Sequence, residues 1–167
     1  MSEISALENL FSLPVKLIFT DLDGSLLDHH SYSFKPAEDM LEQLEPQGIP
    51  VIPITSKTMA ELLPLRVLLN NPHPFIVENG AAIYIPKHYF SRKPQKAKAV
   101  EDFWVIENAA SRNTWLTLLD NNSDEFFDEY QTFNSINEEQ GIEGIAELTG
   151  LSSSMAILAN QREYSEP

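Results

Sequence analysis

The chain has 167 residues, of which 43% are hydrophobic, so it can bury the core of one domain or of one domain with part of a second. Its 25 acidic and 11 basic residues give a formal net charge of −14, which repels nucleic-acid phosphates and anionic membrane surfaces and makes both poor partners. The absence of cysteine excludes disulfides, zinc–thiolate sites and thiol nucleophiles.

The first residues carry no targeting pattern. Residues 1–8 contain two acids and no basic region, unlike a secretory signal. No apolar run approaches the ~20 residues that a membrane-spanning helix requires. We therefore expect a cytoplasmic protein, and the sequence predicts no particular oligomeric state.

The first 85 residues alternate between apolar runs and helical patterns. Four short apolar runs are typical of buried strands: residues 15–20, 49–54, 74–77 and 81–85. Two segments with helical spacing separate the first three runs: residues 36–47 and 58–69. Strand–helix alternation predicts a Rossmann-like α/β core with a parallel sheet, whose ligands gather at the carboxyl ends of the strands.

The pattern changes after Pro86. Residues 88–98 are basic and loop-like, and residues 103–106 form a strand candidate. Three further segments predict helices: residues 111–119, 142–149 and 152–161. We expect an α/β domain in residues 1–86 and a small α+β module attached to it in residues 87–167.

The first helix of this second half has an apolar face. Trp115, Leu118 and Leu119 are spaced so that they lie on one side of the helix that begins at Ser111. We expect these three side chains to be buried.

Asp21 and Asp23 follow the first predicted strand and flank a single leucine. Two carboxylates this close can both stay ionised when they share a divalent cation, and Mg²⁺ prefers carboxylate and phosphate oxygens. One aspartate can then attack phosphorus and form an aspartyl-phosphate, while the other transfers protons to and from the departing and attacking oxygens. Gly24 permits the sharp chain reversal that such a loop requires.

Other structures also use an Asp-x-Asp-Gly string. An EF-hand calcium loop needs glycine at its sixth position and glutamate at its twelfth, which here are Leu26 and Tyr32, so this reading is excluded. An ordinary turn and a receiver-type phosphoacceptor domain both stay open on these residues alone.

Thr55 and Ser56 follow the second predicted strand. Their hydroxyl and N–H groups can bind a phosphate held at the end of the first strand, or they can cap the following helix. We expect the next residue, Lys57, to be solvated. Residues 78–80 by themselves predict only a tight turn.

Together these segments resemble the haloacid dehalogenase-like phosphatases. Residues 21–28 match the first motif of the family, with Ser25 where threonine is usual, and Thr55 or Ser56 corresponds to the phosphate-binding hydroxyl of the second motif. A finer resemblance, to mannosyl-3-phosphoglycerate phosphatases and related capped sugar phosphatases, rests on three strings: residues 55–61, 74–83 and 161–167.

The resemblance implies Mg²⁺-dependent hydrolysis of a sugar phosphomonoester, most closely mannosyl-3-phosphoglycerate to mannosylglycerate and phosphate. It implies that Asp21 is the nucleophile, that Asp23 is the acid/base, and that both are metal ligands. Asn79, Gly80 and Arg162 correspond to residues on the substrate side.

The resemblance also implies a longer chain. Family members continue beyond the counterpart of residues 161–167, and that continuation carries a lysine and a second acidic pair that residues 1–167 do not supply. We therefore expect a C-terminally truncated chain, with the N-terminal part of the family's core in residues 1–86 and a partial α+β cap domain in residues 87–167. We also expect an exposed apolar edge at its first strand. Two alternatives remain: a catalytically incompetent remnant or binding protein, and another capped sugar phosphatase of the hexose-phosphate or sucrose-phosphate type.

Overall fold

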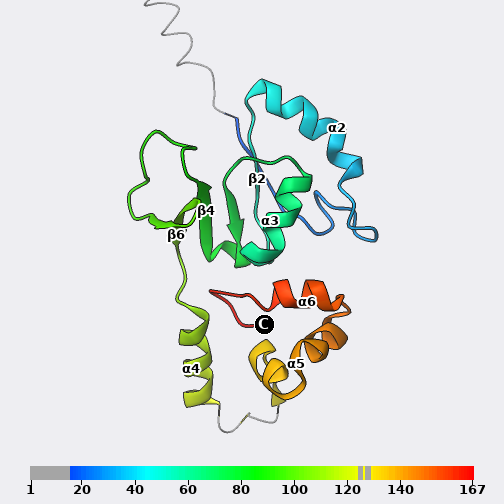
Figure 1. Ribbon diagram of the computed structural model, residues 1–167, viewed down its shortest axis with the longest axis vertical. Helices are drawn as coiled ribbons and strands as arrows, with labels where there is room; N and C mark the ends of the chain where they lie inside the picture. The colour runs from blue at the N-terminus through cyan, green and yellow to red at the C-terminus, as the bar shows by residue number, and fades with distance from the viewer. Residues whose placement is uncertain (1–15, 124–125, 127–128) are drawn as a thin grey trace, which may run out of the picture.

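The computed structural model describes residues 16–123, 126 and 129–167. Val15, the expected start of the first strand, and residues 1–8, where we expect no secretory signal, lie outside this part of the chain. Figure 1 shows two lobes, an upper one that contains the strands and the first helices, and a lower one that contains the last three helices and the C-terminus.

The N-terminal half forms the expected strand–helix alternation. Strands β1 (Ile18–Thr20) and β2 (Val51–Pro53) pair in parallel, and a single parallel bridge from Ile54 to Ile76 leads on to β3 (Phe75–Val77). The connections contain α2 (Lys35–Leu44), a 3-10 turn (η1, Glu45–Gln47) and α3 (Met59–Leu68). The Rossmann-like α/β fold class is confirmed.

β3 belongs to a second, four-stranded antiparallel sheet. β3 pairs with β4 (Ala82–Pro86), β4 with β6 (Phe103–Glu107), and β6 with β5 (Lys98–Val100), which gives the strand order β3-β4-β6-β5. β5 was not predicted, because its three residues are all exposed and show no apolar alternation. β4 lies before the predicted domain boundary at residue 86 and β6 lies after it, so one sheet contains strands from both sides of this boundary. The division into domains at residues 1–86 and 87–167 remains a prediction.

Three helices form the lower lobe: α4 (Arg112–Asn122), α5 (Phe133–Thr149) and α6 (Ser153–Ala159). α5 begins nine residues before the predicted helix at 142–149, because Thr132 caps it through the backbone N–H of Ser135. Its helical geometry breaks at Gly141, where φ is +70°, so the predicted segment is only its second part. Ser152 caps α6 as expected, accepting a hydrogen bond from the N–H of Met155.

The expectation of a buried apolar face on α4 is wrong. The side chains of Trp115 and Leu118 are 40% and 49% exposed. Helical spacing identified the shared face correctly, but this face borders an open pocket instead of packing against another element.

The main core lies under the strands of the upper lobe. Phe75 is fully buried and stacks on Tyr84 with 5.3 Å between ring centroids, and Phe103 meets both rings edge-on. The Arg66 guanidinium lies 4.3 Å above the centre of the Phe75 ring and donates a 2.6 Å hydrogen bond to the carbonyl of His73. Burial lowers the pKa of Arg66 to about 10, which still leaves it charged at neutral pH.

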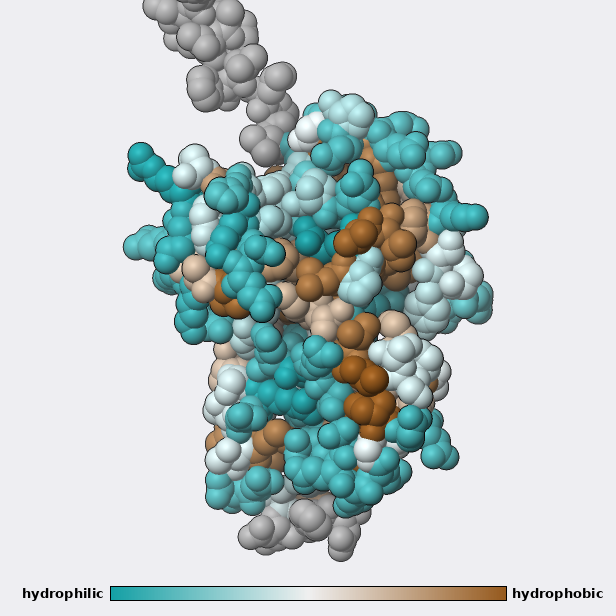
Figure 2. All heavy atoms as spheres, in the orientation of Figure 1, coloured by the Kyte–Doolittle hydropathy of each residue, from teal (hydrophilic) through white to brown (hydrophobic). Residues whose placement is uncertain are grey.

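A second, smaller core joins α5 to α6 through buried apolar side chains, among them Ile136, Ile145 and Ala156. The face visible in Figure 2 is mainly hydrophilic, with apolar patches in both lobes. No helix among the described residues is both long enough and apolar enough to cross a membrane.

Candidate active site

The loop after β1 is anchored by apolar side chains. Leu22 is fully buried and Leu27 is 3% exposed. The backbone N–H of Leu26 donates to the carbonyl of Asp21 at 3.2 Å, and that of Leu27 donates to Leu22 at 2.8 Å. Gly24 takes a φ of +73°, the left-handed conformation that glycine adopts without steric cost. The loop is therefore a tight chain reversal that is anchored in the core by the buried side chains of Leu22 and Leu27.

The two aspartates differ in their partners. Asp21 is exposed, and its Oδ1 accepts a 2.7 Å hydrogen bond from the N–H of Leu22. Asp23 is half-buried, and its Oδ2 lies 2.9 Å from the ammonium of Lys57. The other oxygen, Oδ1, is buried and has no hydrogen-bond partner among the described residues. The expectation of a solvated Lys57 is wrong, because this ion pair holds the lysine side chain at 19% exposure.

The segment after β2 approaches the same loop. The cap of α3 is Thr58, whose hydroxyl accepts from the N–H of Glu61 while the Glu61 carboxylate accepts from Thr58. The alternative role of Thr55 and Ser56 as helix caps is therefore wrong. The Thr55 hydroxyl accepts from the N–H of Lys57 at 3.1 Å and keeps its own proton free to donate, while Ser56 is exposed.

Five of the seven residues expected at the site line one pocket of about 410 Å³: Asp21, Asp23, Thr55, Ser56 and Asn79. Phe19, Thr20 and Ile54 complete its wall. We call this space the carboxylate pocket. Gly80 does not line it, and its carbonyl accepts a hydrogen bond from the side chain of Asn108. Arg162 approaches from the C-terminal segment, as described below.

The turn after β3 is joined to the segment after β2 by backbone hydrogen bonds. The N–H of Glu78 donates to the carbonyl of Lys57 at 3.0 Å, and the N–H of Asn79 donates to Thr55 at 2.9 Å. Both turn residues have positive φ, +48° and +59°, which is uncommon for residues other than glycine. These hydrogen bonds hold Asn79 in the wall of the carboxylate pocket.

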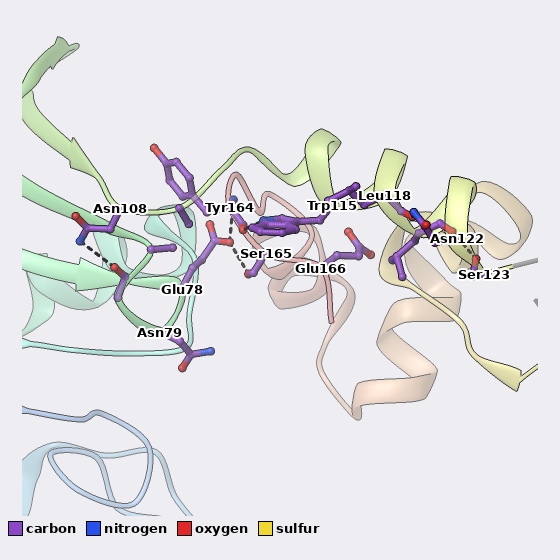
Figure 3. A pocket seen from close by; sticks show the side chains of 14 residues that line it. Glu78, Asn79, Asn108, Trp115, Leu118, Asn122, Ser123, Tyr164, Ser165 and Glu166 are labelled. Carbon is purple, nitrogen blue, oxygen red and sulfur yellow. Dashed lines mark hydrogen bonds between the residues drawn. The ribbon is translucent and has the colours of Figure 1, made fainter. Parts of the chain in front are cut away.

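Glu78 also holds the C-terminal segment. Its carboxylate is buried at 3% exposure and accepts three hydrogen bonds: from the N–H of Glu163 at 2.9 Å, the N–H of Tyr164 at 3.1 Å and the hydroxyl of Ser165 at 2.6 Å. Figure 3 shows Glu78 pointing at this segment. Residues 161–167, which we call the strap, are thereby tied to the core.

The strap brings a cation to the site. Arg162 Nη1 donates to the carbonyl of Ser56 at 3.2 Å and to the hydroxyl of Ser165 at 3.0 Å. Its Nε is buried and has no hydrogen-bond partner among the described residues. The guanidinium therefore lies beside a wall residue of the carboxylate pocket with donor capacity to spare.

Sequence reasoning did not identify Lys57 and Glu78 as parts of the site. The local spacing of Lys57 predicts a solvated side chain, because it contains no information about Asp23, which lies 34 positions earlier in the chain. Glu78 was read as part of a tight turn. The sequence did contain a signal for both residues, because Lys57 lies in residues 55–61 and Glu78 in residues 74–83, two of the strings on which the family resemblance rests.

The residues at the carboxylate pocket supply the type of oxygen ligand that Mg²⁺ prefers, but fewer protein ligands than its six coordination positions. Mg²⁺ takes six oxygens, commonly one or two carboxylates with water and substrate phosphate. Asp21 and Asp23 supply two carboxylates, and the buried, unpartnered Oδ1 of Asp23 is an oxygen that a cation would satisfy. No group of three or more acidic or histidine side chains with metal-binding geometry occurs in residues 16–123, 126 and 129–167.

Comparison with protein families places this site in a known class. The model of the haloacid dehalogenase-like hydrolases matches residues 18–151. This range contains both aspartates and the segment after β2, and the chain belongs to this family.

Two curated relatives refine the comparison. The chain is 39% identical over 150 residues to a glucosyl-3-phosphoglycerate/mannosyl-3-phosphoglycerate phosphatase from Methanococcoides burtonii. It is 35% identical over 153 residues to a protein of the same name from Persephonella marina. Each match covers 90% of this chain and 54% of the relative, so the chain spans about half the length of the curated relatives it matches. The predicted resemblance is confirmed.

A solved structure supports the fold. A phosphatase of the haloalkanoate superfamily from Bacteroides thetaiotaomicron aligns with a TM-score of 0.54 and 16% identity, over 90% of this chain and 53% of that one. At this identity the likeness concerns the fold alone.

Proposed function

We propose that this chain carries the nucleophile of a Mg²⁺-dependent phosphatase that hydrolyses a sugar phosphomonoester. The observation that carries the proposal is the carboxylate pocket, where Asp21 and Asp23 meet Thr55, Ser56 and Asn79 from two other strand ends. The names of the two curated relatives point to a glycosyl-3-phosphoglycerate as the substrate, with mannosyl-3-phosphoglycerate as the first compound to test.

Asp21 suits the role of nucleophile. Its carboxylate is exposed, and the N–H of Leu22 holds one oxygen at 2.7 Å, which leaves the second oxygen free to attack phosphorus. The attack forms an aspartyl-phosphate and breaks the bond from phosphorus to the sugar-side oxygen. Water then hydrolyses the aspartyl-phosphate and regenerates the carboxylate.

Asp23 suits the role of acid and base. It gives a proton to the departing sugar-side oxygen in the first step and takes one from the attacking water in the second. Its side chain lines the same pocket as Asp21, so it lies beside the position of the reacting phosphate.

The phosphate would be held by donors from the segment after β2 and from the strap. The hydroxyls of Thr55 and Ser56 line the pocket, and the Arg162 guanidinium contacts the carbonyl of Ser56. A guanidinium provides charged, directional hydrogen bonds to phosphate oxygens. Asp21 and Asp23 would hold Mg²⁺, which when bound neutralises charge on the phosphate and on both carboxylates.

Phosphate release from mannosyl-3-phosphoglycerate, measured with Mg²⁺ and with excess EDTA, tests the proposal. We expect Mg²⁺-dependent release by the wild-type chain and none by Asp21→Asn, since an amide cannot act as the nucleophile. Glucosyl-3-phosphoglycerate, mannose 6-phosphate and sucrose 6-phosphate in parallel distinguish the substrate types. No release from any of them would contradict the proposal.

A second candidate is a catalytically incompetent remnant or binding protein. It is favoured by the presence of only two carboxylates, Asp21 and Asp23, among the described residues that line the pocket. Mg²⁺ affinity measured by calorimetry separates the candidates when combined with the activity assay. Millimolar affinity together with absent activity supports the remnant, whereas micromolar affinity contradicts it.

A further inference from the structure

A second, larger pocket adjoins the carboxylate pocket. It has a volume of about 770 Å³ and lies between the turn after β3, the helix α4 and the strap. Figure 3 shows Trp115, Leu118 and Asn122 of α4 on one part of its wall, and Glu78 and Ser165 on another. The two pockets share one residue, Asn79. A ligand bound in both would therefore pass Asn79.

The wall contains a fixed aromatic surface. The indole N–H of Trp115 donates a 2.9 Å hydrogen bond to the carbonyl of Tyr164, which holds the ring against the strap. The ring is nevertheless 40% exposed, and Leu118 beside it is 49% exposed. Part of this apolar surface is therefore open to the pocket.

Three side-chain amides line the same pocket, those of Asn79, Asn108 and Asn122. Asn108 and Asn122 use only their Nδ2 groups, which donate to the carbonyls of Gly80 at 3.1 Å and of Leu118 at 2.7 Å. The side-chain amide of Asn79 makes no hydrogen bond within residues 16–123, 126 and 129–167. The pocket therefore presents amide oxygens and one complete amide that are free to bind a ligand.

The acidic residues of the wall are already paired. Glu78 accepts its three hydrogen bonds from the strap, and Glu166 pairs with Arg112 and accepts from the N–H of Asn134. The pocket thus offers no free charge at these positions to attract a cation. An apolar ring flanked by neutral amides is suited to an uncharged, hydroxyl-rich ligand, whose C–H face packs on the ring while its hydroxyls bind the amides.

We propose that this space is the binding site for the glycosyl group of the substrate, and we call it the glycosyl pocket. The proposal rests on the proposed function, because it assigns the two parts of a glycosyl phosphate ester to two adjoining pockets. The phosphate occupies the carboxylate pocket, the sugar lies against Trp115, and Asn79 contacts the ligand where the pockets meet. The volume is within the range of about 300–1,000 Å³ typical of small-molecule sites.

The chain allows a direct binding test, because it contains only two tryptophans. Trp104 lies in β6 and does not line the glycosyl pocket, so Trp104→Phe leaves Trp115 as the single reporter. We expect saturable changes in Trp115 fluorescence on titration with mannosylglycerate and with methyl α-mannoside, neither of which carries phosphate. An emission spectrum that does not respond to either compound would overturn the proposal.

Two neighbouring amides provide a matched pair of variants on the Trp104→Phe background. Asn121 and Asn122 are both exposed, both lie in the last turn of α4, and each donates a 2.7 Å hydrogen bond to the carbonyl four residues before it. Only Asn122 lines the glycosyl pocket. Asn122→Ala should raise the Kd for mannosylglycerate about three- to tenfold, the effect of losing one hydrogen bond, whereas Asn121→Ala should leave it unchanged.

Equal effects of the two alanine variants would overturn the proposal, because they would show that the helix and not the pocket determines the change. Failure of the proposed function is recognised separately. Sugar binding at Trp115 without phosphate release from any ester supports the glycosyl pocket and contradicts the phosphatase. Phosphate release without a fluorescence response contradicts the glycosyl pocket alone.

Discussion

At the scale of single residues, the carboxylate pocket depends on the alternation of Asp21, Leu22 and Asp23. Leu22 is fully buried and anchors the loop, so the aspartates on either side of it are held at the surface of the core. Lys57 then distinguishes the two acids, because its ammonium lies 2.9 Å from Asp23 alone. One carboxylate is thus paired with a cation and the other is open to solvent.

Removal of the Lys57 charge should strengthen Mg²⁺ binding. In Lys57→Met the carboxylate of Asp23 loses a competing cation, and a half-exposed ion pair contributes up to about 1 kcal/mol, so the Kd for Mg²⁺ should fall by up to about fivefold. Isothermal titration calorimetry measures this change. Lys93→Met, at an exposed loop position, is the control and should leave the Kd unaltered. Weaker binding by Lys57→Met would show that the lysine supports the metal site.

At the scale of elements, the strap links the C-terminal segment to the strands. Glu78 accepts hydrogen bonds from three consecutive strap residues, and Tyr84 of β4 donates to Glu163 at 2.7 Å. Arg112, at the start of α4, pairs with Glu166. The two lobes are therefore connected by a network of buried polar contacts, which is costly to leave partly unsatisfied.

Glu78→Gln should destabilise the fold by about 2 kcal/mol, because the new amide nitrogen faces N–H and hydroxyl donors that need an acceptor. Urea unfolding followed by circular dichroism measures the loss. The matched control is Glu101→Gln, since Glu101 also has a positive φ but is exposed. Loss of the same size in both variants would mean that backbone strain and not the strap determines the effect.

The contact between Tyr84 and the strap should make stability fall in alkali. Burial raises the pKa of Tyr84 above its ordinary value of 10.0, and the hydrogen bond to Glu163 raises this pKa further. Above about pH 10 the unfolded chain therefore loses this proton while the folded chain keeps it, so the free energy of unfolding decreases as the pH rises. Below pH 10 the phenol is protonated in both states and contributes no pH dependence.

A proton that the unfolded chain has lost and the folded chain keeps lowers the free energy of unfolding by about 1.4 kcal/mol per pH unit. In Tyr84→Phe the decline between pH 10 and 11 should be shallower by about that slope, as measured by urea unfolding at each pH. Between pH 7 and 8 the difference between the two proteins should stay constant, which provides an internal control. Parallel curves up to pH 11 would contradict the prediction.

At the scale of the whole molecule, β1 is the open side of the sheet. Among the described residues it pairs only with β2, and Leu17, Ile18 and Phe19 are 47%, 37% and 53% exposed. Unpaired backbone groups beside exposed apolar side chains favour association with other chains. The exposed apolar edge that we expected at the first strand is present in the structure.

Leu17→Lys should therefore reduce concentration-dependent self-association of the 167-residue chain, because it places a charge beside this edge. Light scattering across a range of protein concentrations measures the effect. Val67→Lys is the comparison, since Val67 is 80% exposed but lies on α3, away from any strand edge. An equal reduction by both variants would indicate a general effect of net charge instead of a role for the edge.

Much of the N-terminal half could be predicted from local pattern. Apolar runs followed by polar loops identified β1 to β4, and the strand-end position of Asp21, Asp23, Thr55 and Ser56 predicted their convergence. The lower lobe was harder. The start of α5 depends on a cap at Thr132. The exposure of Trp115 depends on which element packs against α4, and helical spacing contains no information about that element.

The sequence by itself determined that the carboxylates of Asp21 and Asp23 lie near Thr55 and Ser56, because residues that follow neighbouring parallel strands meet at one edge of the sheet. Only the tertiary structure decided the ion pair of Lys57 with Asp23, the attachment of the strap to Glu78 and the glycosyl pocket beside Trp115. Each of these joins residues dozens of positions apart. Such contacts follow from how strands and helices pack, and no local pattern of residues encodes them.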